Sequence, residues 1–275
     1  MLDATITAAD FAFVADLVRR RCSLILEPGK EYLIKARLLP LAERHGHTSI
    51  AQYIETLRSG DESLTTDVVE AMVTTETSFF RDIHPFETLK KIVLPQLIEL
   101  RRPQRQLHIW CAASSSGQEP YSIAMLLKEH FPELESWRVN LTATDISQEM
   151  LARCRSGRYS QIEVNRGLPA TLLLKWFRQE GASWFLNDRI RSMVTFSPLN
   201  LAQPWPPMPT WDLVFLRNVM IYFDNEVKKQ ILGRVSRLLS RDGYLLLGGA
   251  ETTLSLDDSY QRVEALKGGF YQLKP

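Results

Sequence analysis

Hydrophobic residues recur at helical spacing through the first part of the chain. Phe11, Val14, Leu17 and Val18 recur at steps of three and four positions. Thr7 precedes them with Asp10 three residues later, as in a capping box. The same periodicity predicts further helices over residues 30–45, 49–59, 62–73 and 84–100. The two-residue alternation of a strand is missing before residue 106. We therefore expect an all-α domain over residues 1–100.

From residue 106 the pattern changes to strands that alternate with helices. Strands are predicted over residues 107–111, 139–144, 193–196, 213–216, 244–247 and 270–273, and helices over 121–130, 148–154 and 225–239. This order predicts a doubly wound, mostly parallel α/β sheet that binds its ligand at the carboxyl ends of the strands. The polar segment 101–105 marks the start of this domain, which covers residues 101–275. An insert over about residues 157–193 is expected to add one helix and a small antiparallel hairpin.

The first predicted strand leads into a turn made of small residues. Residues 112–117 are all alanine, serine or glycine, and a helix follows them, as in nucleotide-binding α/β folds. Only Gly117 is glycine, so the dinucleotide fingerprint GxGxxG is missing. Glu119 at the mouth of the helix would repel a pyrophosphate but attract a cation. The turn therefore predicts a site for S-adenosylmethionine, which carries an ammonium and a sulfonium. The alternative is that Glu119 only stabilises the helix N-terminus.

Polar side chains follow the carboxyl ends of three predicted strands. Asp145 closes the second strand, where nucleotide folds place an acid that accepts both ribose hydroxyls. Asn200 follows the third strand, and Arg217 and Asn218 follow the fourth. An amide that both donates and accepts can bind the edge of an adenine. A helix cap at Asp145 and turn formation at the asparagines are the alternatives.

The segment TTETSFFR before the sheet domain carries a second candidate group. Thr77 and Arg81 are four residues apart, so on a helix they would share a face. Arg81 could bind a carboxylate through two parallel hydrogen bonds. A solvated surface arginine is the alternative.

Composition and charge limit the classes of function. Hydrophobic residues make up 45% and charged residues 24%, and the formal net charge is +1, which argues against a nucleic-acid partner. The three cysteines are far apart and form no CxxC pair, so we expect no structural zinc and a reducing compartment. The chain shows no signal peptide and no apolar run long enough to span a membrane, so we expect a cytoplasmic protein that does not insert into the membrane.

Taken in order, these segments resemble the CheR family, the chemoreceptor glutamate methyltransferases of bacterial chemotaxis. The matching pieces are TTETSFFRDIHPF, IWCAASSSGQEPYSIA, ATDIS, FSPLNL and FLRNVMIYF, together with Arg37-Leu38 in the second predicted helix. The resemblance covers nearly the whole chain. It implies a helical domain packed on a methyltransferase-type α/β domain that carries a small β insert.

The resemblance also implies site residues by position. Contacts to the methyl donor fall to Thr75, Thr77, Arg81, Glu119, Asp145, Asn200, Leu201, Arg217 and Asn218. Tyr222 stands where the family has its active-site tyrosine, and we expect it to orient the attacking carboxylate together with Arg81. Thr75 replaces an asparagine that is frequent in relatives. Relatives frequently have an acid where this chain has Gln118, so we expect no acidic contact from this position.

The implied reaction moves the methyl group of S-adenosylmethionine to glutamate carboxylates of methyl-accepting receptors and releases S-adenosylhomocysteine. A glutamate is already ionised at pH 7, so in-line transfer needs neither a general base nor a metal. Two alternatives stay open: a methyltransferase that acts on another substrate, and a sensory module that only binds the donor or its product.

Receptor docking is expected on the helical domain. Lys30, Arg37 and Arg44 recur every seven residues beside an apolar helix face, and residues 19–44 hold seven basic against three acidic side chains. Such a stripe fits the acidic cytoplasmic helices of receptors, whereas a solvated helix face is the alternative. In some relatives the insert also binds a tethering peptide at the C-terminus of the receptor. The turn over residues 179–183 is short here, so we expect no binding of such a peptide. We expect a monomer.

Overall fold

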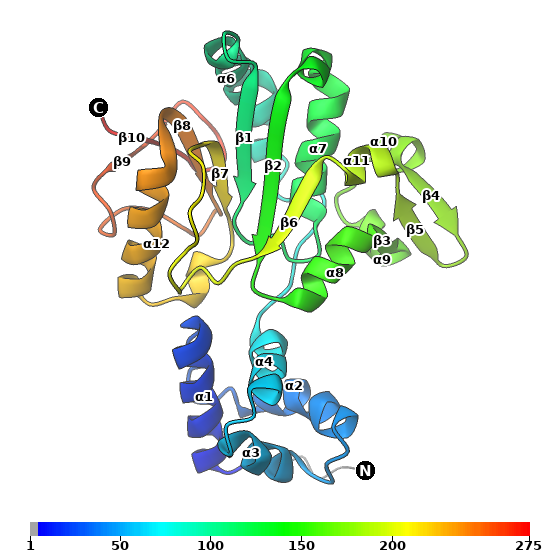
Figure 1. Ribbon diagram of the computed structural model, residues 1–275, viewed down its shortest axis with the longest axis vertical. Helices are drawn as coiled ribbons and strands as arrows, with labels where there is room; N and C mark the ends of the chain where they lie inside the picture. The colour runs from blue at the N-terminus through cyan, green and yellow to red at the C-terminus, as the bar shows by residue number, and fades with distance from the viewer. Residues whose placement is uncertain (1–4) are drawn as a thin grey trace. The chain divides into compact units, whose positions relative to one another are not determined.

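The computed structural model describes residues 5–275, which form two compact units (Figure 1). The first unit comprises the described residues up to Thr74 together with Tyr222–Val227, and the second comprises Thr75–Ile221 and Lys228–Pro275. The units therefore divide earlier in the chain than the boundary that the sequence predicts after residue 100.

The first unit contains four helices, at the positions that hydrophobic periodicity predicts. They are α1 (Ala8–Cys22), α2 (Glu31–Arg44), α3 (Ile50–Arg58) and α4 (Glu62–Met72). Thr7 caps α1, and the carboxylate of Asp10 accepts the Thr7 amide at 3.0 Å in return. Val14, Ile34 and Val68 are fully buried, so the apolar faces of these helices form the core of this unit.

The helical segment before the sheet explains where the units divide. It consists of α5 (His84–Thr88), a π-helical turn (Leu89–Val93) and α6 (Leu94–Arg101). Phe86, Leu89 and Leu97 belong to the buried cluster that includes the sheet residues. Because its apolar face packs on the sheet, this segment belongs to the second unit, and the polar segment after it is a connection within that unit.

The π-helical turn of this segment coincides with a proline. The amide of Leu94 donates to the carbonyl of Leu89, five residues back, and Pro95 is the next residue. A proline has no amide hydrogen, and its ring clashes with the carbonyl four residues earlier in a regular α-helix. The wider turn accommodates Pro95 without ending the helical segment.

The second unit is built on a seven-stranded sheet with the order β6-β2-β1-β7-β8-β10-β9. The strands are β1 (Gln106–Cys111), β2 (Arg138–Asp145), β6 (Val194–Pro198), β7 (Trp211–Leu216), β8 (Leu239–Leu247), β9 (Tyr260–Arg262) and β10 (Phe270–Leu273). The first five in this order pair in parallel, and β10 is antiparallel to both of its neighbours. The predicted doubly wound, mostly parallel sheet is confirmed. The short edge strand β9 is not predicted, because its only buried side chain is Tyr260.

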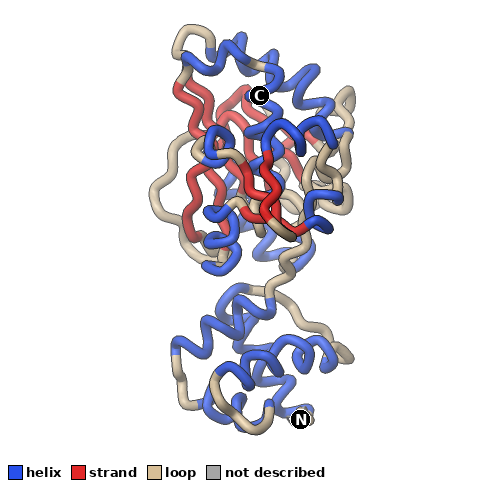
Figure 2. Tube along the Cα trace, turned by 90° about the vertical axis from the view of Figure 1, so that its right-hand side faces the viewer, coloured by secondary structure: helices blue, strands red, loops and turns tan. Residues whose placement is uncertain are grey.

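Helices enclose this sheet, as Figure 2 shows, with strands in red through the interior and helices in blue around them. They include α7 (Gln118–His130), the 3-10 turn Pro132–Ser136, α8 (Gln148–Ser156) and α12 (Asn225–Leu238). Every residue of β7 is buried, which requires cover on both faces of the sheet.

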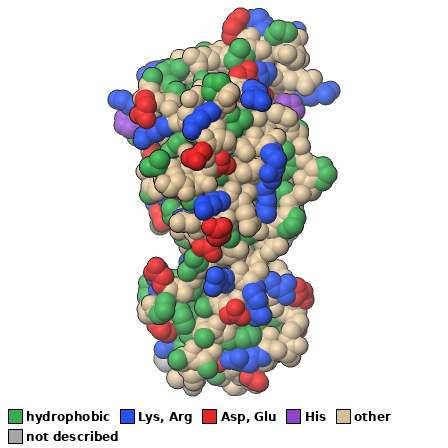
Figure 3. Space-filling view, turned by 90° about the vertical axis from the view of Figure 1, so that its left-hand side faces the viewer, with side chains coloured by type: hydrophobic (Ala, Val, Ile, Leu, Met, Phe, Trp, Pro, Cys, Tyr) green, Lys and Arg blue, Asp and Glu red, His purple; other side chains and the backbone are tan. Residues whose placement is uncertain are grey.

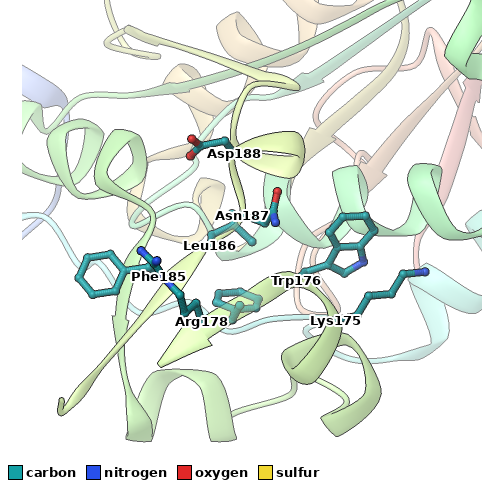
Figure 4. A pocket seen from close by; sticks show the side chains of 8 residues that line it. Lys175, Trp176, Arg178, Phe185, Leu186, Asn187 and Asp188 are labelled. Atoms are coloured by element: carbon teal, nitrogen blue, oxygen red, sulfur yellow. The ribbon is translucent and has the colours of Figure 1, made fainter. Parts of the chain in front are cut away.

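The insert folds as a separate three-stranded antiparallel sheet with the order β3-β5-β4. Its elements are β3 (Arg158–Ser160), α9 (Gln161–Asn165), α10 (Ala170–Trp176), β4 (Phe177–Glu180), β5 (Ser183–Leu186) and α11 (Asp188–Arg191). The predicted hairpin is present as β4 and β5, whereas the insert has three short helices in place of the one expected and a third strand. A pocket of about 330 Å³ lies on the insert; Trp176 and Lys175 reach along one side of it and Arg178 and Phe185 lie on the other (Figure 4).

Two features of the molecule bear on its partners. On the face shown in Figure 3, Lys and Arg side chains are interspersed with Asp and Glu side chains. Within residues 5–275, no helix combines the length and the apolar character that crossing a membrane requires.

The order of the strands locates the ligand crevice. The chain runs from β1 outward to β2 and β6, and then returns to place β7 on the other side of β1. In open α/β sheets, ligands bind outside the carboxyl ends of the strands at such a reversal. The crevice therefore lies at the ends of β1 and β7.

Candidate functional site

The turn after β1 requires glycine at its last position. Gly117 has φ 96°, a conformation that L side chains rarely adopt. A Cβ atom there would lie 3.1 Å from Cys154 Sγ, from Tyr121 and from the Tyr159 hydroxyl. The backbone of the turn thus packs tightly on its inner side, where no side chain fits.

Hydrogen bonds from three segments hold this turn at Ser115. The amide of Ser115 donates to Asp145 Oδ2 at 2.7 Å, and its hydroxyl donates to the carbonyl of Thr75 at 2.6 Å. The thiol of Cys154 donates to the carbonyl of Ser115 at 3.1 Å. Burial raises the pKa of Cys154 to about 12, so the group keeps the proton that this bond needs. The predicted site residues Thr75 and Asp145 therefore meet at the turn.

Asp145 ends β2, and its carboxylate is buried. Besides the Ser115 amide, it accepts the amide of Ser147 through Oδ1 at 3.0 Å. Ser147, not Asp145, is the N-cap of α8, because its hydroxyl accepts the Met150 amide. The alternative role of Asp145 as the cap of that helix is therefore wrong. Its position beside the turn is the one expected for a ribose-binding acid.

Asn200 and Leu201 come to the same end of the sheet through β6. Pro198 pairs with Asp145 in the parallel register, and the Leu199 amide donates to the Asp145 carbonyl at 2.9 Å. The side-chain oxygen of Asn200 accepts the Ala202 amide, which shapes the loop as the turn interpretation expects. Leu201 is buried and can contribute an apolar wall.

Glu119 and Arg217 form one ionic group with Asp82. Arg217 Nη1 lies 2.7 Å from Glu119 Oε2, and Nη2 lies 2.7 Å from Asp82 Oδ2. The Arg217 side chain is only 1% exposed and that of Glu119 is 12% exposed, whereas Asp82 faces solvent. The sequence predicts Glu119 and Arg217 as site residues but not their pairing, and it does not predict Asp82.

Burial raises the pKa of Glu119, and the positive charge of Arg217 opposes this effect. A buried carboxylate attracts a cation strongly, because charges interact more strongly in low-dielectric surroundings than in water. A ligand ammonium beside Glu119 would therefore be favoured, and a phosphate would not.

The segment from Thr75 to Ile83 is not helical, so Thr77 and Arg81 do not share a helix face as the sequence predicts. It is extended and then turns sharply, with positive φ at Phe80, Asp82 and Ile83. The Arg81 guanidinium donates to the carbonyl of Glu76 at 3.3 Å. The helical-face expectation is wrong, since the turn is needed to bring Asp82 to Arg217.

A carboxylate that the sequence does not predict anchors the loop after β7. Glu251 accepts the amides of Asn218 at 2.7 Å, Val219 at 2.9 Å and Met220 at 2.8 Å. It also accepts the amide of Gly248 at 2.7 Å. Asn218 has φ 57°, and this left-handed turn points its amide to Glu251. The sequence offered one signal for this residue: Glu251 lies close to the carboxyl end of a buried strand, as Asp145 does.

Tyr222 ends the 3-10 turn Met220–Tyr222 that follows this loop. It groups with the first unit, where its carbonyl accepts the amide of Ile25 at 3.3 Å. The structure thus places the predicted catalytic tyrosine directly after the anchored loop in the chain. Its catalytic role stays a prediction.

The three basic residues of the docking stripe differ in their surroundings. Arg37 is half-buried and donates to the carbonyls of Ala71 and Val73, both at 2.7 Å, at the end of α4. Lys30 pairs with Glu27 at 3.1 Å on the surface, and Arg44 is exposed. Arg37 therefore stabilises the fold of the first unit, while Lys30 and Arg44 present their charges to solvent.

Comparison with known proteins agrees with this architecture. Residues 75–268 match the family model described as CheR methyltransferase, SAM binding domain, and residues 9–73 match its all-alpha domain. The chemotaxis protein methyltransferase 1 of Pseudomonas aeruginosa is 40% identical over 271 residues, 97% of this chain and 98% of the relative. The chemotaxis protein methyltransferase of Vibrio parahaemolyticus is 36% identical over 279 residues, all of both chains.

Proposed function

The chain belongs to the CheR methyltransferase family, and we propose that it transfers the methyl group of S-adenosylmethionine to glutamate carboxylates of chemoreceptors. Its relatives are named chemotaxis protein methyltransferases over nearly the whole length of the chain. The product on the receptor would be a glutamate methyl ester, and the second product would be S-adenosylhomocysteine.

The residues at the ends of β1, β2 and β7 fit this donor. Glu119 would bind the ammonium of its amino acid part, with Arg217 fixing the carboxylate in place. Asp145 would accept the ribose hydroxyls, and the turn at 112–117 lets the nucleoside approach backbone. Thr75, Thr77, Asn200, Leu201 and Asn218 complete the set of proposed contacts. When bound, the donor supplies a methyl group on a positively charged sulfur, with a neutral thioether as the leaving group.

The catalytic task of the chain is then alignment. The substrate glutamate is ionised near neutral pH, because its ordinary pKa is about 4.3. We propose that Arg81 and Tyr222 orient the attacking oxygen by charge-assisted hydrogen bonds, so no residue has to remove a proton. Correct orientation alone can lower a barrier by several kcal/mol, up to about 7–11 in ideal cases.

Receptor docking on the first unit is proposed for Lys30 and Arg44, whose charges face solvent. They would attract acidic receptor helices in a salt-dependent manner, whereas donor affinity would not depend on salt to the same degree.

The buried Glu119–Arg217 pair at the mouth of α7 is the observation that carries this proposal. It is tested by incubating the protein with radiolabelled donor and receptor-containing membranes. We expect label on receptor glutamates that is released as methanol by mild base. Label that is stable to base would indicate another acceptor. Donor binding without transfer to any acceptor would indicate a sensory module.

A further inference from the structure

A cavity of about 640 Å³ in the α/β unit is lined by Arg217 but not by its partner Glu119. Its wall comes from three segments: the turn at residues 82–85, the loop 248–252 after β8, and the stretch 262–271 that leads into β10. Arg217 lines it as well. The cavity therefore shares one side chain with the proposed donor site.

The two carboxylates that line this cavity are already engaged. Asp82 pairs with Arg217 at 2.7 Å, and Glu251 accepts four backbone amides of the loops at residues 218–220 and 248. Their negative charge is therefore largely compensated by donors of the protein itself.

Two exposed cations of the cavity are not compensated in this way. Arg262 and Lys267 are exposed, and throughout residues 5–275 neither side chain has an ion pair or a hydrogen bond. Lys267 contributes only its backbone carbonyl, to the hydroxyl of Thr88. The charge of Arg217 is held by Glu119 and Asp82, and only its buried Nε has no hydrogen-bond partner. The cavity thus presents donors and positive charge to an incoming anion.

Glycines form part of the wall of this cavity. A Cβ at Gly248 would lie 2.7 Å from the Asn218 amide group and from Glu251, and one at Gly268 would lie 2.9 Å from Pro85. Gly249 has no atom within 4 Å of its Cβ position, so that part of the wall is open. The volume of about 640 Å³ is in the range of ligand pockets and is far larger than one small ion, so the space can hold part of a chain segment.

We propose that this cavity binds an acidic segment of the protein substrate, with Arg262 and Lys267 contacting its carboxylates. This inference rests on the proposed function, since it assigns the substrate of the same reaction a second contact surface outside the helical unit. Arg262 and Lys267 are two cations on different residues, so each can contact a separate carboxylate of one acidic segment. Because Arg217 borders both spaces, a segment held here lies next to the donor site.

The test uses the full chain with the paired substitutions Arg262→Glu and Lys267→Glu. Arg241→Glu with Lys274→Glu is the matched control, because it changes the same charge at exposed residues of the same unit that do not line the cavity. Initial rates are measured against receptor concentration at several salt concentrations, and affinity for S-adenosylhomocysteine is measured by calorimetry.

We expect the cavity variant to raise the KM for receptor about tenfold, with kcat and product affinity near those of the wild type and a weaker salt dependence of KM. Equal KM values for the cavity variant and the control would overturn the inference while leaving the proposed function intact. If the wild type esterifies no receptor glutamate, the proposed function fails, and this inference fails with it. Binding of inorganic phosphate to the wild type but not to the cavity variant, with KM unchanged, would make the cavity a small-anion site and overturn the proposal.

Discussion

Arg217 donates to the carboxylate of Glu119 at 2.7 Å, although the two residues are 98 positions apart in the chain. Arg217 follows β7, and Glu119 lies in the first turn of α7, the helix after β1. The pair therefore links the segments that follow the two strands at the crevice. The pair fixes the orientation of the acid that would bind the donor ammonium. The first predictions concern this carboxylate.

Glu119→Gln should weaken binding of S-adenosylhomocysteine at pH 7.5 by about tenfold or more, since a hydrogen bond to a charged group contributes about 1.5–3 kcal/mol. Calorimetry measures the dissociation constant. Glu99→Gln, on the exposed surface of α6, is the matched control and should bind like the wild type. A Glu119→Gln protein with unchanged affinity would show that the ammonium is bound elsewhere.

The pH dependence of binding should follow the same residue. Burial raises the pKa of Glu119, so this carboxyl takes up its proton at a higher pH than an ordinary glutamate does. Binding of an ammonium needs the ionised form, so affinity should be complete above this pKa and decrease as the pH falls through it. Glu119→Gln should lack this decrease. The same slope in both proteins would assign the titration to another group.

Glu251→Gln should impair turnover more than donor binding. The substitution keeps the shape of the side chain but removes the charge that accepts the amides of Asn218, Val219 and Met220. We expect kcat to fall about tenfold, because the loop that leads to Tyr222 is then less well ordered. Steady-state kinetics separate kcat from KM, and the melting temperature shows whether the fold is retained. A Glu251→Gln enzyme with the wild-type kcat contradicts the anchoring role.

Gly117→Ala should destabilise the protein by about 1–3 kcal/mol, because a side chain at positive φ is strained and the Cβ would contact Cys154 and Tyr159 at 3.1 Å. Gly249→Ala is the control, since nothing lies within 4 Å of its Cβ position. Urea unfolding followed by circular dichroism gives both values. Equal stability of the two variants would show that the turn can relax.

The sequence predicts the ends of the strands better than the contacts between them. The apolar strand before the small-residue turn is present as β1, and Asp145 ends β2, so both predicted features lie at the carboxyl edge of the sheet. Which side chains pair across that edge depends on strand order. The periodicity of one segment carries no information about a partner such as Arg217, which arrives from a distant strand.

The turn before α5 shows a second limit. Phe80 and Ile83 have φ values of 46° and 43°, which local preferences disfavour for aromatic and β-branched residues. Tertiary contacts stabilise this backbone: the Phe80 amide donates to the Ser122 hydroxyl at 2.9 Å, and Asp82 pairs with Arg217. A helical reading of this segment follows local spacing, and these long-range bonds override it.

The most direct test of the account is a crystal structure of the protein with S-adenosylhomocysteine. We predict that the ammonium of the ligand lies within hydrogen-bond distance of Glu119, and that its ribose hydroxyls face Asp145. Electron density for the nucleoside away from both carboxylates would contradict the assignment of this edge of the sheet as the donor site.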